Sequence, residues 1–161
     1  LKAAPILAEA LKHSPYNMNN QRYKAVIYTI MGKKTKAVNI YRHLLQRHRK
    51  SYLYQELAEL LDDRGAKIAL LCRAIVAQRE EKYRQRMRFQ LASMLFVDDK
   101  RKAKYELDKC IATRKQAGYS ITWEMQNLMA SLESVQPASE VEQKGFYREQ
   151  EQVVEALIRN G

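Results

Sequence analysis

The stretch Asn19–Lys50, NNQRYKAVIYTIMGKKTKAVNIYRHLLQRHRK, predicts two amphipathic helices joined by a tight turn at Gly32. Small and large residues alternate through it at helical spacing, in the order Ala25, Tyr28, Gly32, Ala37, Tyr41 and Leu44. Residues three or four positions apart share a helix face, so small residues allow two helices to approach while aromatic side chains fill the space opposite. The stretch therefore predicts an antiparallel helix pair.

The pattern returns after Lys50 with a period of 33 to 34 residues. Its later copies contain first Leu57, Ala58, Leu61 and Gly65, and then Leu91, Ala92 and Leu95. A period of this length is typical of supersecondary units that bury their apolar faces against their neighbours in a stack. No apolar run with a period of two occurs, so we expect an all-α fold.

The expected organisation is a single domain made of successive helical units. In chain order these are the second helix of an incomplete repeat (1–15), three repeats (18–50, 51–84 and 85–117) and a degenerate helix pair that caps the stack (119–161). Gly118 ends the third unit, Ser120 is the expected N-cap of the next helix, and Ser139 with Glu142 forms a capping pattern for the last. The chain enters in mid-repeat, which predicts that it belongs to a longer protein.

The period and its small and large positions resemble the tetratricopeptide repeat family over roughly Leu1 to Lys115. The sequence departs from the family at Lys24, where a large apolar residue is usual, and at Asp99, which replaces a turn glycine. The resemblance implies a right-handed superhelix of stacked antiparallel helix pairs, whose first helices line a concave groove. The groove positions that it implies are Asn19, Arg22, Val26, Thr29, Tyr52, Gln55, Glu59, Asp62, Arg86, Phe89, Ser93 and Phe96.

Seven of these positions are candidates for binding a protein: Asn19, Arg22, Tyr52, Gln55, Arg86, Phe89 and Phe96. Arginine and aromatic residues among them are the types that dominate interface energetics, although simple solvent exposure explains each equally well. Some members of the family clamp the carboxyl-terminal carboxylates of chaperones with Lys and Asn. Here Val26 stands where the asparagine is expected, and Glu56, Glu59 and Asp62 would repel an acidic tail.

The net charge of +11 is concentrated in the amino-terminal third. Ten cations and no acid lie between Glu9 and Glu56, and the candidate anion-binding residues among them are Lys33, Lys34, Lys36, Arg42, Arg47, Arg49 and Lys50. Phosphates of RNA or DNA would suit such a surface. The alternative is a solvated basic face. Tyr28 and Tyr41 occupy packing positions and cannot stack on bases, whereas Tyr16, Tyr23, Tyr52 and Tyr54 are less constrained.

No pattern for catalysis, a metal or a cofactor emerges from the remaining polar residues. His43 and His48 are five residues apart, which does not place two ligands on one helix face. The pairs Asp62/Asp63 and Asp98/Asp99 fall at turns, where acids act as caps. Cys72 and Cys110 lie in apolar runs and indicate buried thiols in a reducing compartment such as the cytoplasm. No apolar run reaches the length of a membrane span.

The sequence thus favours a non-catalytic, tetratricopeptide-like scaffold that binds a protein, a peptide or a neighbouring domain of the same chain. The alternative is a helical module that binds RNA or DNA through its basic third, within a larger nucleic-acid-processing or defence protein.

Overall fold

The computed structural model describes residues 5–6, 8–9, 12 and 17–159, so the helix predicted over 1–15 lies largely outside the described residues. The described part of the chain is all-helical and contains no strand, as the sequence predicts. Its elements are α2 (Met18–Ile30), α3 (Lys34–Leu45), α4 (Ser51–Leu60), α5 (Arg64–Ala77), the short 3₁₀ helix η1 (Glu81–Tyr83), α6 (Gln85–Leu95), α7 (Lys100–Ala117), α8 (Trp123–Ser131) and α9 (Glu140–Arg159).

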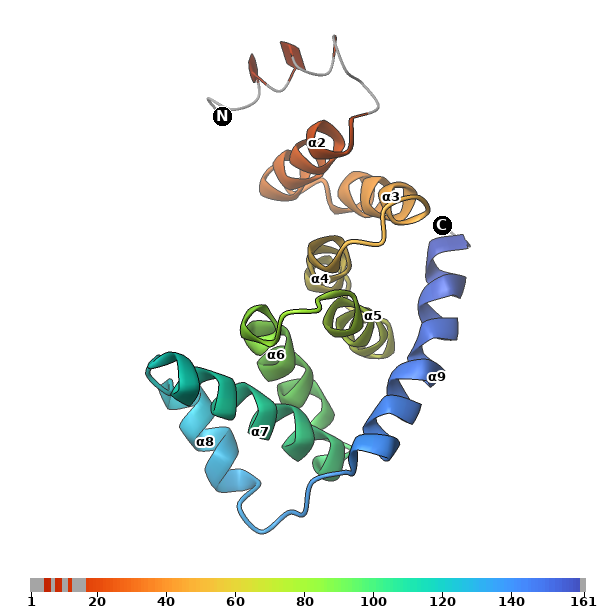
Figure 1. Cartoon of the computed structure of the whole chain (residues 1–161). Coiled ribbons are helices and arrows are strands. Elements are labelled where there is room, and N and C mark those ends of the chain that lie inside the picture. Colours follow the sequence, from red (N-terminus) through yellow and green to blue (C-terminus); the bar gives the residue numbers. More distant parts are fainter. Residues whose placement is uncertain (1–4, 7, 10–11, 13–16, 160–161) are drawn as a thin grey trace.

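Consecutive helices pack in pairs, α2 with α3, α4 with α5 and α6 with α7, and the pairs follow one another along the molecule (Figure 1). The small residues of the pattern lie where the helices meet: Ala25 and Ala37 are completely buried. Tyr41 is buried beside them, as expected. Tyr54 is also buried, which corrects the expectation that its ring is unconstrained.

Two glycines end helices in the left-handed region. Gly32 has φ +76° after α2, and the N–H of Lys33 donates to the Tyr28 carbonyl at 2.8 Å. Gly118 has φ +77° after α7. This geometry satisfies carbonyls that the last helical turn leaves without partners. Gly65 does not repeat the role of Gly32, because it lies inside the first turn of α5 and has no positive φ.

Polar side chains cap the amino ends of several helices. Asp63 accepts a hydrogen bond from the Ala66 N–H at 2.8 Å, and Asp99 accepts one from Lys102 at 3.2 Å. Ser139 accepts one from the Glu142 N–H at 3.1 Å. These caps confirm the predicted roles. The expected cap at Ser120 is wrong, because Thr122 caps α8 and the helix begins at Trp123.

The two carboxyl-terminal helices do not form a pair across the end of the stack, which corrects the arrangement expected for 119–161. Helix α8 contacts α7, whereas α9 runs back along the molecule and packs extensively on α5 and also on α3 (Figure 1). Its Val154 and Ile158 side chains are buried there. The extensive contacts of α9 are with second helices of the pairs. Its contacts with the first helices α2, α4 and α6 are not extensive. The first helices therefore keep a surface that α9 does not cover.

Candidate functional site

Side chains one period apart meet across α2 and α4. The Arg22 guanidinium pairs with Glu56 at 2.7 Å and lies 4.7 Å from the centre of the Tyr52 ring. The Tyr41 hydroxyl of α3 also donates to Glu56, at 2.7 Å. The hydrogen bond to Glu56 raises the pKa of Arg22, and burial raises the pKa of Tyr41. The positive charge of Arg22 therefore offsets the negative charge of Glu56, so the pair adds little net charge to this surface.

A second set of polar contacts joins α4 to α6. The Gln55 side-chain amide donates to Gln90 at 3.1 Å, and Gln90 donates to Glu59 at 3.3 Å. Arg86 also donates to Glu59 at 3.3 Å while most of its side chain stays exposed. The predicted groove residues Gln55, Glu59 and Arg86 are thus brought together on one surface.

An apolar hollow of about 260 Å³ lies beside these contacts. Its lining residues are Ala58, Glu59, Lys67, Leu71, Phe89, Gln90, Ser93 and Met94. Three of them, Glu59, Phe89 and Ser93, are groove positions from the sequence. The Lys67 ammonium is satisfied by the carbonyls of Ala58 and Leu61 at 2.7 and 2.9 Å. Concave, mainly apolar surfaces with a few polar groups at the rim are typical of binding sites.

Two other predicted groove residues lie elsewhere. Asn19 is exposed on α2 and does not line the hollow. Phe96 follows the last residue of α6, packs partly against the core and has the Lys100 ammonium 5.2 Å from its ring centre. The candidate anchors therefore do not form one continuous set.

The cations of the amino-terminal third are partly neutralised. Lys34 pairs with Asp62 and Arg49 pairs with Glu155 of α9, each at 2.8 Å. The other candidate anion-binding residues form no ion pair with described residues: Lys33, Lys36, Arg42, Arg47 and Lys50. They are not one patch, because Lys33 and Lys36 lie at the beginning of α3, Arg42 lies in its last turn, and Arg47 and Lys50 follow its end. A helix of 12 residues separates these ends by about 18 Å.

A smaller cluster of positive charge surrounds Tyr28. The ammonium groups of Lys24, Lys33 and Lys36 lie 5.8, 6.0 and 5.5 Å from the centre of its ring. Tyr28 is partly buried and packs against the core, as its position in the pattern predicts, but part of its side chain stays exposed. None of the three lysines forms an ion pair with the described residues, which leaves this cluster with unbalanced charge.

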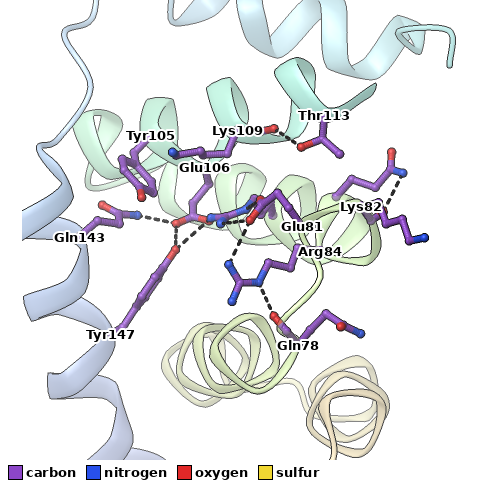
Figure 2. Close-up of polar contacts among 12 residues, drawn as sticks. Gln78, Glu81, Lys82, Arg84, Tyr105, Glu106, Lys109, Thr113, Gln143 and Tyr147 are labelled. Carbon is purple, nitrogen blue, oxygen red and sulfur yellow. Dashed lines mark hydrogen bonds and ion pairs between the residues drawn. The ribbon is translucent and has the colours of Figure 1, made fainter. Parts of the chain in front are cut away.

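The structure contains a buried polar network that the sequence analysis does not identify. Glu106 of α7 is completely buried and accepts a hydrogen bond from Arg88 of α6 at 2.7 Å. Two side chains of α9 complete its partners, because Gln143 donates to Glu106 at 2.7 Å and Tyr147 donates its hydroxyl (Figure 2). Arg88 also donates to Glu81 of η1 at 3.1 Å. The network ties α6, α7 and α9 together.

Burial and hydrogen bonding act in opposite directions on these groups. Burial raises the pKa of Glu106, while Arg88 and the two neutral donors counteract part of the rise. Burial also raises the pKa of the Tyr147 hydroxyl. At Glu81 burial acts to raise the pKa, but the hydrogen bonds from Arg88 and Arg84 outweigh it and the pKa lies below its ordinary value.

The sequence does carry a signal for this network. Arg88 precedes Leu91, Ala92 and Leu95 by three, four and seven residues, which places it on the apolar face of α6. Glu106 lies three residues after Ala103 and four before Cys110, on the apolar face of α7. Charged residues at core positions are rare unless they are paired. Two such residues on neighbouring helices therefore indicate a buried ion pair.

The remaining chemistry is limited within the described ranges. No group of three or more His, Cys, Asp or Glu residues in them is placed to hold a metal ion. Cys72 and Cys110 are buried free thiols, and burial raises the pKa of Cys110 to about 11. Among the helices described, none is both long and apolar enough to cross a membrane.

The fold defines an all-helical protein of packed helix pairs with a long carboxyl-terminal helix along one side. The chain belongs to the family described as a domain of unknown function (DUF7017), which matches residues 21–153. Comparison with curated proteins and with solved structures finds no match.

Proposed function

We propose that this chain is a non-catalytic, tetratricopeptide-like scaffold that binds a segment of a partner protein on the surface of α4 and α6. The apolar hollow beside Phe89 is the observation that carries the proposal. It lies on the first-helix side, where the family resemblance places a groove, and α9 leaves that side open. Its size suits one large apolar side chain of a bound peptide.

Contacts between positions one period apart support a superhelical stack. Arg22 pairs with Glu56 and Arg64 pairs with Asp98, and each pair is separated by 34 residues. Equivalent positions of neighbouring units face each other in a stack of repeats. These two ion pairs therefore support such an architecture.

The rim of the hollow indicates the chemistry of the bound segment. Arg86 is exposed and Glu59 is partly exposed. Arg86 can therefore pair with an acidic residue of a bound peptide, and Glu59 with a basic one. The floor is apolar through Leu71, Phe89 and Met94. We expect a peptide with one large apolar anchor, flanked by polar residues.

Blocking the hollow tests this function. Ser93 lies at its edge and is exposed, with its hydroxyl bonded to the Phe89 carbonyl. In Ser93→Trp, peptides selected by display against the natural protein should bind at least about 10-fold more weakly, because the indole occupies the anchor position. Ser131→Trp is the matched control, since Ser131 is exposed on α8 and its hydroxyl bonds to the Asn127 carbonyl in the same way.

Two results would contradict the scaffold proposal. One is a selection that yields no peptides with a recurrent apolar anchor. The other is a set of peptides whose binding is equal in Ser93→Trp and Ser131→Trp, because that would place the binding site away from the hollow.

A second candidate function is favoured by the lysine cluster at Tyr28. Three ammonium groups without acidic partners suit the phosphates of RNA or DNA. Lys33→Glu with Lys36→Glu should then weaken the binding of a single-stranded RNA probe and reduce the salt dependence of the remaining binding. The control is the double variant Arg42→Glu with Lys50→Glu, at the other end of α3, which should bind the probe as tightly as the natural protein does. Salt-insensitive or undetectable binding would exclude this function.

A further inference from the structure

We propose that a cleft between α5, α7 and α9 binds the phosphate group of a small phosphomonoester. This cationic cleft shares no lining residue with the hollow on α4 and α6, so the inference stands apart from the scaffold function. It lies beside the buried network, because the network residues Arg88 and Tyr147 form part of its wall.

The cleft has a volume of about 510 Å³, within the range of about 300 to 1,000 Å³ of small-molecule sites. Six cations line it: Arg73, Arg84, Arg88, Lys109, Lys144 and Arg148. The carboxylates in its lining are Glu81, Glu140 and Glu151. The lining therefore carries more positive than negative charge, and concave walls concentrate the resulting field.

Two of the carboxylates are fully engaged by cations of the lining. Glu81 accepts hydrogen bonds from Arg84 at 3.0 Å and from Arg88. Glu140 pairs with Lys109 at 3.0 Å. These pairs fix part of the wall and leave their cations unavailable to a ligand.

The other three cations lack a close carboxylate partner. Lys144 and Arg148 are exposed one turn apart on α9 and form no ion pair with any residue in the described ranges. Arg73 approaches Glu151 only to 3.9 Å. Three cations from α5 and α9 thus line the cleft, and Glu151 is the one carboxylate of the lining that remains to balance them.

Arg73 supplies an independent observation. Its Nε atom is buried and has no hydrogen-bond acceptor in the described part of the chain. Buried donors are nearly always paired, so an unpaired one in the wall of a cleft indicates an acceptor that comes from outside the chain. A rotation of the Arg73 side chain toward the cleft would bring this donor to an anionic oxygen bound there.

A phosphomonoester fits this arrangement better than a singly charged anion. Its charge is close to −2 at pH 7, and it has three strong acceptor oxygens for Arg73, Lys144 and Arg148. The cleft is larger than a phosphate group alone, and Ile75, Val76 and Tyr105 provide apolar and aromatic surface in it. That surface would contact the organic part of the ligand.

Phenyl phosphate is a suitable probe, and phenyl sulfate has a similar shape with a single negative charge. In a calorimetric or NMR titration at pH 7.5, phenyl phosphate should bind at least about 10-fold more tightly than phenyl sulfate. Lys144→Ala and Arg148→Ala should each weaken the binding of phenyl phosphate by a similar factor. Arg159→Ala removes a cation from the end of the same helix, outside this cleft, and should leave binding unchanged.

All three substituted residues are exposed, so the variants should keep the same unfolding midpoint. The proposal would be overturned by undetectable binding of phenyl phosphate. Equal binding of phosphate and sulfate probes, or an equal loss in Arg159→Ala, would also overturn it, because either result would show only general attraction to a basic surface. Tight binding of peptides at the hollow would not alter that conclusion.

Discussion

The molecule contains two Arg–Glu ion pairs with the same separation of 2.7 Å but different surroundings. In the Arg22–Glu56 pair, between α2 and α4, the side chains are 30% and 21% exposed. In the Arg88–Glu106 pair, between α6 and α7, they are 4% and 0% exposed. The first pair forms between positions one period apart, whereas the second is completed by Gln143 and Tyr147 of α9. The comparison separates contacts set by the repeat from contacts set by the carboxyl-terminal helix.

The difference in burial predicts a difference in the cost of breaking each pair. Water and salt screen a partly exposed pair, and removing one partner leaves the other able to be solvated. A buried pair has no such compensation, because the remaining charge stays in a low-dielectric interior. The following predictions test this contrast in order of expected effect.

The largest effect is expected for Glu106→Ala. It leaves Arg88 buried with only Glu81 as an acidic partner and removes the acceptor of Gln143 and Tyr147. The free energy of unfolding in urea should fall by about 3 to 5 kcal/mol. Glu59→Ala is the control and should change it by no more than about 0.5 kcal/mol, because the Glu59 side chain is 44% exposed and its ion pair with Arg86 is open to solvent. Equal effects of the two substitutions would show that the network does not stabilise the fold.

Next in size is the contrast between two glycines one period apart. Gly32→Ala should destabilise the protein by about 1 to 2 kcal/mol, because alanine resists φ +76° although its Cβ would meet no atom. Gly65→Ala should be neutral or stabilise by up to about 1 kcal/mol, because Gly65 lies inside α5. Thermal unfolding measures both. A similar loss at both positions would mean that the two repeats share one turn geometry.

A smaller effect is expected at the exposed pair. A double-mutant cycle with Arg22→Ala and Glu56→Ala should give a coupling energy of about 0.5 to 1 kcal/mol. The coupling should decrease in high salt, because the pair is partly open to solvent. A coupling as large as the loss in Glu106→Ala would remove the distinction between the two pairs.

The smallest effect concerns pH and distinguishes the two carboxylates that flank Arg88. The pKa of Glu81 lies below its ordinary value of 4.5, so its contribution to stability is complete above that pH and is lost as the pH falls through the folded-state pKa. Glu81→Gln should therefore make the acid-side loss of stability shallower. Burial raises the pKa of Glu106, so its contribution has the opposite slope and decreases as the pH rises above 4.5.

Urea unfolding of Glu81→Gln between pH 3 and pH 6, compared with Glu106→Gln, measures these slopes. A steeper acid-side loss in Glu81→Gln than in the natural protein would contradict the depressed pKa of Glu81.

The candidate surfaces differ in the same way, because one depends on the repeat positions in the sequence and the others depend on long-range packing. Glu59, Phe89 and Ser93 meet at the hollow as the repeat positions suggest. The basic residues that the sequence groups into one surface do not form a single patch, because they lie at both ends of α3 and two of them pair with acids, including one on α9. The cationic cleft could not be predicted at all, since it depends on where α9 packs.

The sequence by itself determined that the described chain is helical, where several of its helices begin or end, and which small residues lie between paired helices. These features depend on periodicity, caps and turn glycines, which act over a few residues. Only the tertiary structure decided that α9 returns along α5 and α3, and with it the buried network around Glu106 and the cleft at Arg73. The position of a terminal helix depends on burial against distant segments, and an amphipathic pattern does not specify which apolar surface it will cover.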